Sequence, residues 1–183
     1  MDNTNISLNR IVQRAKDILT FNTRTYEEIV RDPNATTEAA IVVATVAIAS
    51  GLGRLFAGPG ALIGAVLAML LGWVVAAAVI YFVGTRITGE ATTTSSVERV
   101  MRIVGYASAP FVFSIFSGLW LIGWLFATVI FFWFLGTMVL AIRAALDISL
   151  SRAIVTGLIA WIATLIVNGI LSVIFNINPQ FFL

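Results

Sequence analysis

The sequence predicts an all-α polytopic membrane protein with five transmembrane helices and two amphipathic interfacial helices. Of its 183 residues, 60% are hydrophobic and 11% are charged, and the mean hydropathy is +1.00. A water-soluble domain of this size could not cover so much apolar surface. The apolar runs exceed the roughly 20 residues that a helix needs to cross about 30 Å of hydrocarbon, and they lack the roughly 10-residue alternation of outer-membrane strands.

Residues 1–36 are expected to form an amphipathic segment on the cytoplasmic side. Within residues 7–21, apolar side chains recur at helical spacing, and the opposite face carries Arg10, Gln13, Arg14, Lys16 and Asp17. This helix is too short and too charged to cross a bilayer. It should lie in the headgroup region or pack on the cytoplasmic face of its own protein.

A second short helix should start at Thr25 and end at Pro33. Thr25 can cap its first turn while Glu28, three residues later, reaches back as in a capping box. Its polar surface is a candidate partner-docking site made of Tyr26, Glu27, Glu28 and Arg31. The alternative is a solvated charged face with no partner.

Residues 37–183 should form the transmembrane bundle, with spans at about 37–57, 61–83, 106–121, 123–144 and 153–175. The Gly58-Pro59-Gly60 break is so short that the first two spans must be antiparallel neighbours. The stretch from Tyr106 to Ala144 has no charge before Arg143 and is about twice the length of one span. It must therefore fold back, and two glycines and a tryptophan within 117–123 mark the turn.

The second interfacial helix is expected in the polar stretch 85–105. Ser95 and Glu98 have the spacing of a capping box, and the following apolar residues repeat at helical spacing: Val97, Val100, Met101 and Val104. This helix should lead directly into the third span.

Small residues suggest where the spans pack. Gly60, Gly64, Ala68, Gly72 and Ala76 follow one another at i+4, which makes a ridge that another helix backbone can approach closely. We expect this ridge to hold the bundle together, with a dimer face as the alternative. Asn168 in the fifth span is likewise expected to hydrogen-bond between helices, with a substrate contact as the alternative.

The basic residues predict the orientation. The amino-terminal segment has five Lys and Arg residues, the 85–105 loop has three and the 143–152 loop has two, whereas the opposite side has Arg54 alone. By the positive-inside rule, the amino terminus is cytoplasmic and Leu183 is outside.

The composition leaves little room for catalysis. The chain contains no cysteine and no histidine, which removes the usual ligands of zinc, haem and iron–sulfur clusters and the usual general base near neutral pH. We therefore predict no enzyme activity, no catalytic or metal-binding residue and no cofactor. Mid-span aromatic residues are nevertheless candidates for contact with a partner subunit or a pigment: Trp73, Phe131, Phe132, Trp133, Phe134 and Trp161.

Several motifs in order resemble the Yip domain family (Ypt-interacting proteins) of five-span membrane proteins. They are 25–33 (TYEEIVRDP), 104–110 (VGYASAP), 141–149 (AIRAALDIS) and 152–154 (RAI). The resemblance implies a membrane bundle. Eukaryotic members bind prenylated Rab-type GTPases through a substantial cytosolic amino-terminal region, but here that region is only about 36 residues. This argues against small GTPase binding, and it favours a prokaryotic plasma (inner) membrane over early secretory membranes.

The function predicted from these features is that of a non-enzymatic membrane adaptor or accessory subunit that organises partner proteins or lipids. Its expected partners are the lipid bilayer and other membrane protein subunits, not nucleic acid, because the arginines are scattered. The alternative is a small permease or channel with Asn168 along its path.

Overall fold

The computed structural model describes residues 7–51, 59–89, 95–118 and 122–175, and every regular element in these residues is a helix. In chain order they are α1 (Leu8–Leu19), α2 (Thr23–Arg31), α3 (Ala35–Gly51), α4 (Pro59–Arg86), α5 (Val97–Ala107), the 3-10 helix η2 (Ala109–Gly118), α6 (Gly123–Leu146) and α7 (Leu150–Phe175). The predicted all-α class is confirmed.

The described residues contain four stretches that are long and apolar enough to cross a membrane: Val66–Arg86, Val97–Phe116, Gly123–Leu146 and Leu150–Val167. A fifth apolar stretch, Ala35–Ser50, is shorter. The chain is therefore a polytopic membrane protein, as its composition predicted.

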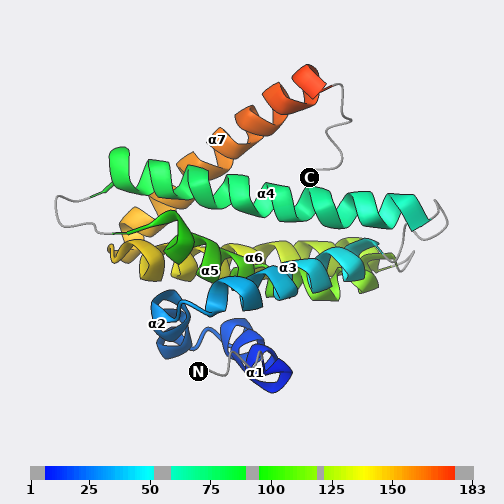
Figure 1. Cartoon of the computed structure of the whole chain (residues 1–183), viewed down its shortest axis with the longest axis horizontal. Coiled ribbons are helices and arrows are strands. Elements are labelled where there is room, and N and C mark those ends of the chain that lie inside the picture. Colours follow the sequence, from blue (N-terminus) through cyan, green and yellow to red (C-terminus); the bar gives the residue numbers. More distant parts are fainter. Residues whose placement is uncertain (1–6, 52–58, 90–94, 119–121, 176–183) are drawn as a thin grey trace, which may run out of the picture.

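Figure 1 shows how the helices are arranged. α4 extends across the molecule, with α7 running obliquely on one side and α3, α5 and α6 on the other. α1 and α2 lie beyond α3, on the side away from α7. Four arginines at helix ends gather at one end of the bundle, which we call the basic end: Arg86, Arg99, Arg143 and Arg152.

The segment predicted as a second interfacial helix is α5, and it packs inside the bundle. Val100, Ile103 and Val104 are buried where α5 meets α3, α4 and α6. Its N-cap is Ser96, one residue later than expected, whose hydroxyl accepts a hydrogen bond from the Arg99 amide. α5 passes into η2 just before Pro110, whose ring nitrogen has no hydrogen to continue the α-helical pattern. The third apolar stretch consequently begins at Val97 and not near Tyr106.

The small-residue ridge is not the face by which α4 packs within the described structure. An added Cβ at Gly64 or Gly72 would meet no atom within 4 Å, and Ala68 and Ala76 are only half-buried. The buried face carries Ala77, Ile80 and Val83. Because successive residues are about 100° apart on a helix, a shift of one residue turns the ridge away from the core. Gly60 and Asn168 belong to α4 and α7, but their surroundings lie outside what the structure describes.

The close approach of helix backbones occurs at Gly105 instead. A Cβ there would lie 2.7 Å from the Ala39 Cβ and 3.1 Å from the Trp73 indole nitrogen. That indole donates a hydrogen bond of 3.0 Å to the carbonyl of Met101. Glycine at 105 therefore lets α3, α4 and α5 meet at one point.

Gly105→Ala should lower the stability of the bundle by about 1–3 kcal/mol, the usual cost of overpacking. Gly72→Ala is the matched control, because it adds the same methyl group where no atom lies within 4 Å. Thermal unfolding in detergent should separate the two variants. Equal unfolding temperatures for Gly105→Ala and the wild type would contradict this packing.

Candidate functional site

A buried carboxylate, Glu38, is the centre of the site. It lies in the first turn of α3 and is only 1% exposed. Arg10 and Arg14 of α1 donate to it, with Arg10 Nε 2.7 Å from Oε1 and Arg14 Nη1 2.7 Å from Oε2. The hydroxyl of Tyr106 on α5 donates to Oε2 at 2.7 Å. Three helices therefore meet at one side chain.

Arg14 extends the cluster to α2. Its Nη2 lies 2.8 Å from a carboxylate oxygen of Asp32, the C-cap residue that follows α2. Two guanidinium groups thus face two carboxylates, and among the described residues no buried side-chain polar atom lacks a hydrogen-bond partner. A buried ion pair of this kind is lost at a high cost when one partner is removed, because the other charge is left without compensation. We call Arg10, Arg14, Asp32, Glu38 and Tyr106 the charge cluster.

The charge cluster lies well inside the bundle. Tyr106 is next to Ala107, whose carbonyl accepts a hydrogen bond of 2.9 Å from Thr137 on α6. At about 1.5 Å per residue, Thr137 is about 9 Å along the helix axis from Arg143. The ion pairs therefore lie nearer the middle of the apolar bundle than Arg143 does. Ionisable groups at such depth are rare and commonly functional.

The sequence interpretation did not find this cluster. It placed Arg14 opposite the apolar face of its helix, whereas Arg14 lies on the same side as the buried residues Ile11 and Ile18 and is only 13% exposed. It also found no ionisable residue in the bundle centre, although Glu38 falls within the predicted span 37–57. The one feature of the sequence that could have revealed the cluster is Glu38, a single acid within an apolar helix.

Three further hydrogen bonds fix α1 and α2 to each other and to the bundle. The Trp133 indole on α6 donates to the Leu19 carbonyl at 2.9 Å. The Tyr26 hydroxyl donates to the Ile18 carbonyl at 3.1 Å, and the Thr25 hydroxyl donates to Asp17 at 3.1 Å. Thr25 is therefore inside α2, which begins at Thr23, and does not cap it. Of the two expectations for α1, the structure has the helix packed on its own protein.

The four docking candidates separate into two groups. Tyr26 is 1% exposed and belongs to the core, so its selection as a docking residue was wrong. Glu27, Glu28 and Arg31 are exposed on the outer face of α2. Glu27 and Arg31 form an ion pair of 3.8 Å along this face. The helical period explains the division, because Tyr26 lies on the buried face of α2 together with Ile29 and Val30.

The aromatic candidates also divide. Trp73 and Trp133 make the internal hydrogen bonds described above, and Phe134 packs on Phe111 with ring centres 4.7 Å apart. These three hold the bundle together and are poorly placed for a partner or pigment. Phe131, Phe132 and Trp161 face outward, with Phe132 65% and Trp161 56% exposed.

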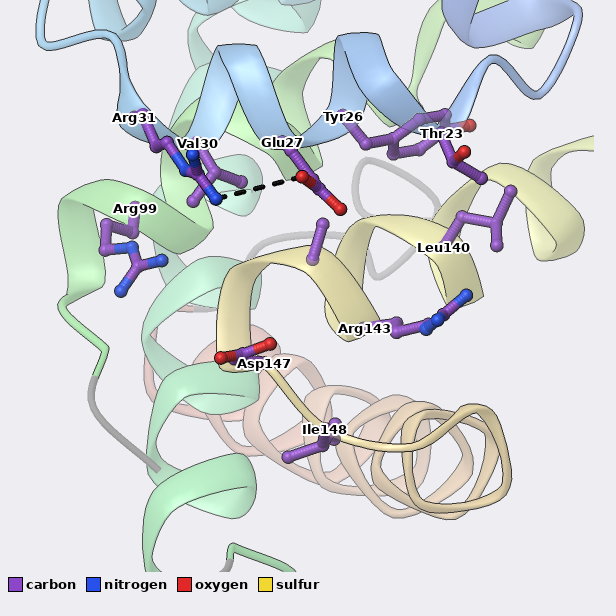
Figure 2. Close-up of a pocket in the computed structure, with 11 residues that line it drawn as sticks. Thr23, Tyr26, Glu27, Val30, Arg31, Arg99, Leu140, Arg143, Asp147 and Ile148 are labelled. Atoms are coloured by element: carbon purple, nitrogen blue, oxygen red, sulfur yellow. Dashed lines mark ion pairs between the residues drawn. The ribbon is translucent and has the colours of Figure 1, made fainter. Parts of the chain in front are cut away.

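A pocket of about 360 Å³ lies at the basic end between α2 and α6. Figure 2 shows Tyr26, Glu27 and Arg31 from α2 above it and Leu140, Arg143 and Asp147 from α6 below, with Arg99 of α5 at one side. The charged residues are three arginines and two acids. Among the described residues no group of three or more acids, histidines or cysteines is placed to hold a metal ion. The pocket is therefore suited to a charged organic group or to a side chain of another protein.

The pKa values outside the spans reflect burial and ion pairing. Burial raises the pKa of Tyr26, so its hydroxyl stays a hydrogen-bond donor at neutral pH. Burial also acts to raise the pKa of Asp32, but the hydrogen bond and charge of Arg14, together with the Asn34 amide, outweigh it. The pKa of Asp32 therefore lies below its ordinary value of 3.8.

Comparison with known proteins identifies one family. The family model described as the Yip1 domain matches residues 16–171, which is well over half of the chain. The match contains Asp32, Glu38 and Tyr106 but begins after Arg10 and Arg14. No curated protein and no solved structure matches the chain.

Glu38→Gln should release α1, because the neutral amide cannot compensate two guanidinium groups. We expect a loss of about 3–5 kcal/mol in unfolding free energy, the range for breaking a buried pair, and faster proteolysis at Lys16. Glu28→Gln makes the same change on the exposed face of α2 and should alter neither measurement. If α1 stays equally resistant to protease in both variants, the charge cluster does not hold it.

The Arg14–Asp32 ion pair should make stability depend on pH. Because the pKa of Asp32 is lowered in the folded protein, the pair stabilises the fold above pH 3.8 and loses this contribution as the pH falls through the folded value. Wild type should exceed Asp32→Asn by about 1 kcal/mol at pH 7. Unfolding measured at decreasing pH should show this difference shrink below pH 3.8, and a constant difference down to pH 2 would contradict the assignment.

Proposed function

The chain belongs to the Yip1 domain family, and we propose that it acts as a non-enzymatic membrane adaptor or accessory subunit. In this role it holds partner proteins at one face of the membrane. The family match supports membrane association. The contacts of α1 and α2 support the more specific role of an adaptor.

The charge cluster is the observation that carries this proposal. An adaptor needs a surface outside the bilayer whose position is fixed relative to its spans. α2 fits this requirement because Arg14 of α1 joins Asp32, just after α2, to Glu38 in α3. The outer face of α2 meanwhile remains exposed at Glu27, Glu28 and Arg31. These charges of both signs favour a polar partner surface with complementary charges.

We further propose that the five apolar helices cross the bilayer in alternate directions, with the basic end in the cytoplasm. The gathering of helix-end arginines there fits the positive-inside rule. α2 then lies on the cytoplasmic side, and α7 ends outside. A plasma membrane is the location we propose.

An accessory-subunit form of the role is supported by the outward aromatic residues. Phe131 and Phe132 on α6 and Trp161 on α7 present large apolar surfaces that no other described helix covers. A transmembrane helix of another subunit can pack on such surfaces.

The permease alternative has less support. Thr45, Thr128 and Thr164 each donate to the carbonyl four residues earlier in their own helix. These hydroxyl groups therefore have partners without lining a solute path. The Thr137 hydroxyl on α6 donates to the carbonyl of Ala107, the last residue of α5, and so links two helices.

A photo-crosslinking residue at position 28 should give a discrete protein adduct in native membranes. Glu27→Lys should reduce the yield of that adduct severalfold by reversing one charge of the docking face, whereas Arg86→Glu at the end of α4 should leave it unchanged. Mass spectrometry would identify the adduct. Recovery of only lipid and free monomer would contradict the adaptor role.

The orientation can be tested separately, because the chain has no native cysteine. Glu28→Cys should be shielded from an impermeant thiol reagent in intact cells, and Ile122→Cys, at the end of α6 opposite the basic end, should react. Reaction of both, or of Glu28→Cys alone, would overturn the proposed topology.

A further inference from the structure

We propose that the pocket at the basic end binds the headgroup of an aminophospholipid, which carries both a phosphate and a primary amine. This site goes beyond the adaptor role, because its ligand is a lipid held between α2 and α6 and not a protein. Glu27 and Arg31 of α2 line the pocket and also belong to the exposed face of α2.

The depth of the pocket matches that of lipid headgroups. Residues 123–142 of α6 contain no charged side chain. At about 1.5 Å per residue this segment is about 30 Å long, which is the thickness of the hydrocarbon core. Arg143 follows immediately and lines the pocket. Leu140 lines it about one turn deeper, on the side from which acyl chains would approach.

The charges of the pocket fit a ligand with both signs. Within the described chain Glu27 and Arg31 are paired with each other, whereas Arg143 and Asp147 form no ion pair with any residue. They are four residues apart, a spacing that favours pairing on a helix, but Asp147 has a φ of 54° in the left-handed region. The chain turns there, so the Asp147 side chain leaves the face that carries Arg143.

Figure 2 shows Arg99 and Arg143 on opposite sides of the pocket, with Asp147 between them. A phosphate is bound best by a guanidinium group through charge-assisted hydrogen bonds, and an ammonium is bound best by a carboxylate. A headgroup with a phosphate next to a primary amine therefore matches Arg143 and Asp147 in one molecule. Phosphatidylglycerol has hydroxyl groups but no cation to pair with Asp147, and the choline of phosphatidylcholine has no N–H to donate to Asp147.

The test is native mass spectrometry of the full-length protein with an equimolar mixture of phosphatidylethanolamine, phosphatidylglycerol and phosphatidylcholine of identical acyl chains. The wild type should retain phosphatidylethanolamine about tenfold over the other two, which corresponds to about 1.4 kcal/mol. Asp147→Asn should remove this preference and leave the other lipids unchanged. Arg143→Gln should weaken retention of all three lipids.

Arg86→Gln is the matched control, because Arg86 is exposed at the same end but does not line the pocket. It should behave as the wild type. Thermal unfolding should be the same for all variants, because the side chains of Arg143 and Asp147 are exposed and form no ion pair within the described residues. If a variant unfolds at a lower temperature, the ratio of the lipids retained by its folded fraction still measures its preference among them.

Competition with soluble phosphoethanolamine distinguishes a lipid headgroup from a soluble ligand that has the same phosphate and amine. Phosphoethanolamine should displace the lipid only at concentrations far above those of the lipid itself. Displacement at equal concentration would overturn the lipid assignment in favour of a soluble ligand. Equal retention of the three lipids by the wild type, or an unchanged preference in Asp147→Asn, would overturn the proposal. Neither result affects the crosslinking expected at position 28.

Discussion

The fold depends on the burial of one carboxylate, Glu38, among apolar helices. A charge in a medium of low dielectric constant must be paired and fully hydrogen-bonded. Among the described residues of the spans, Tyr106 alone donates a hydrogen bond to the Glu38 side chain. The compensating positive charges therefore come from outside the spans. α1 supplies them through Arg10 and Arg14. A short helix that looks like a membrane-surface segment is in this way an integral part of the bundle.

The position of α2 follows from the same interaction. Arg14 also pairs with Asp32 through its Nη2, and Tyr26 links α2 to α1 with a buried hydrogen bond. α2 is thereby held beside the last turns of α6, and the space between them forms the pocket. The exposed docking residues and the pocket therefore share Glu27 and Arg31 of one helix. The position of that helix is set by ion pairs several residues away.

The amount that could be predicted from sequence differs between levels of structure. Lipid-facing helices need long apolar runs, so the helices and their order could be read from hydrophobicity. Packing faces could not, because a rotation of about 100° moves a face by one residue. This shift explains why Gly64 and Gly72 face open space while Gly105 makes the close approach.

Glu38 was overlooked because its partners are 24 and 28 residues earlier in the chain, and no local spacing connects them. Tyr26 was misassigned because an aromatic residue beside exposed acids does not reveal which way it points.

The central claim is that α1 is docked on the transmembrane bundle by Glu38. Distance measurement by pulsed electron paramagnetic resonance in lipid nanodiscs tests it most directly. One spin label replaces Lys16 of α1 and the other replaces Leu158 of α7, and these two helices lie on opposite sides of the molecule in Figure 1. The account predicts one narrow distance distribution in the wild type and a broad one when Glu38 is neutralised. A broad distribution in the wild type, or a narrow one that survives neutralisation, would contradict it.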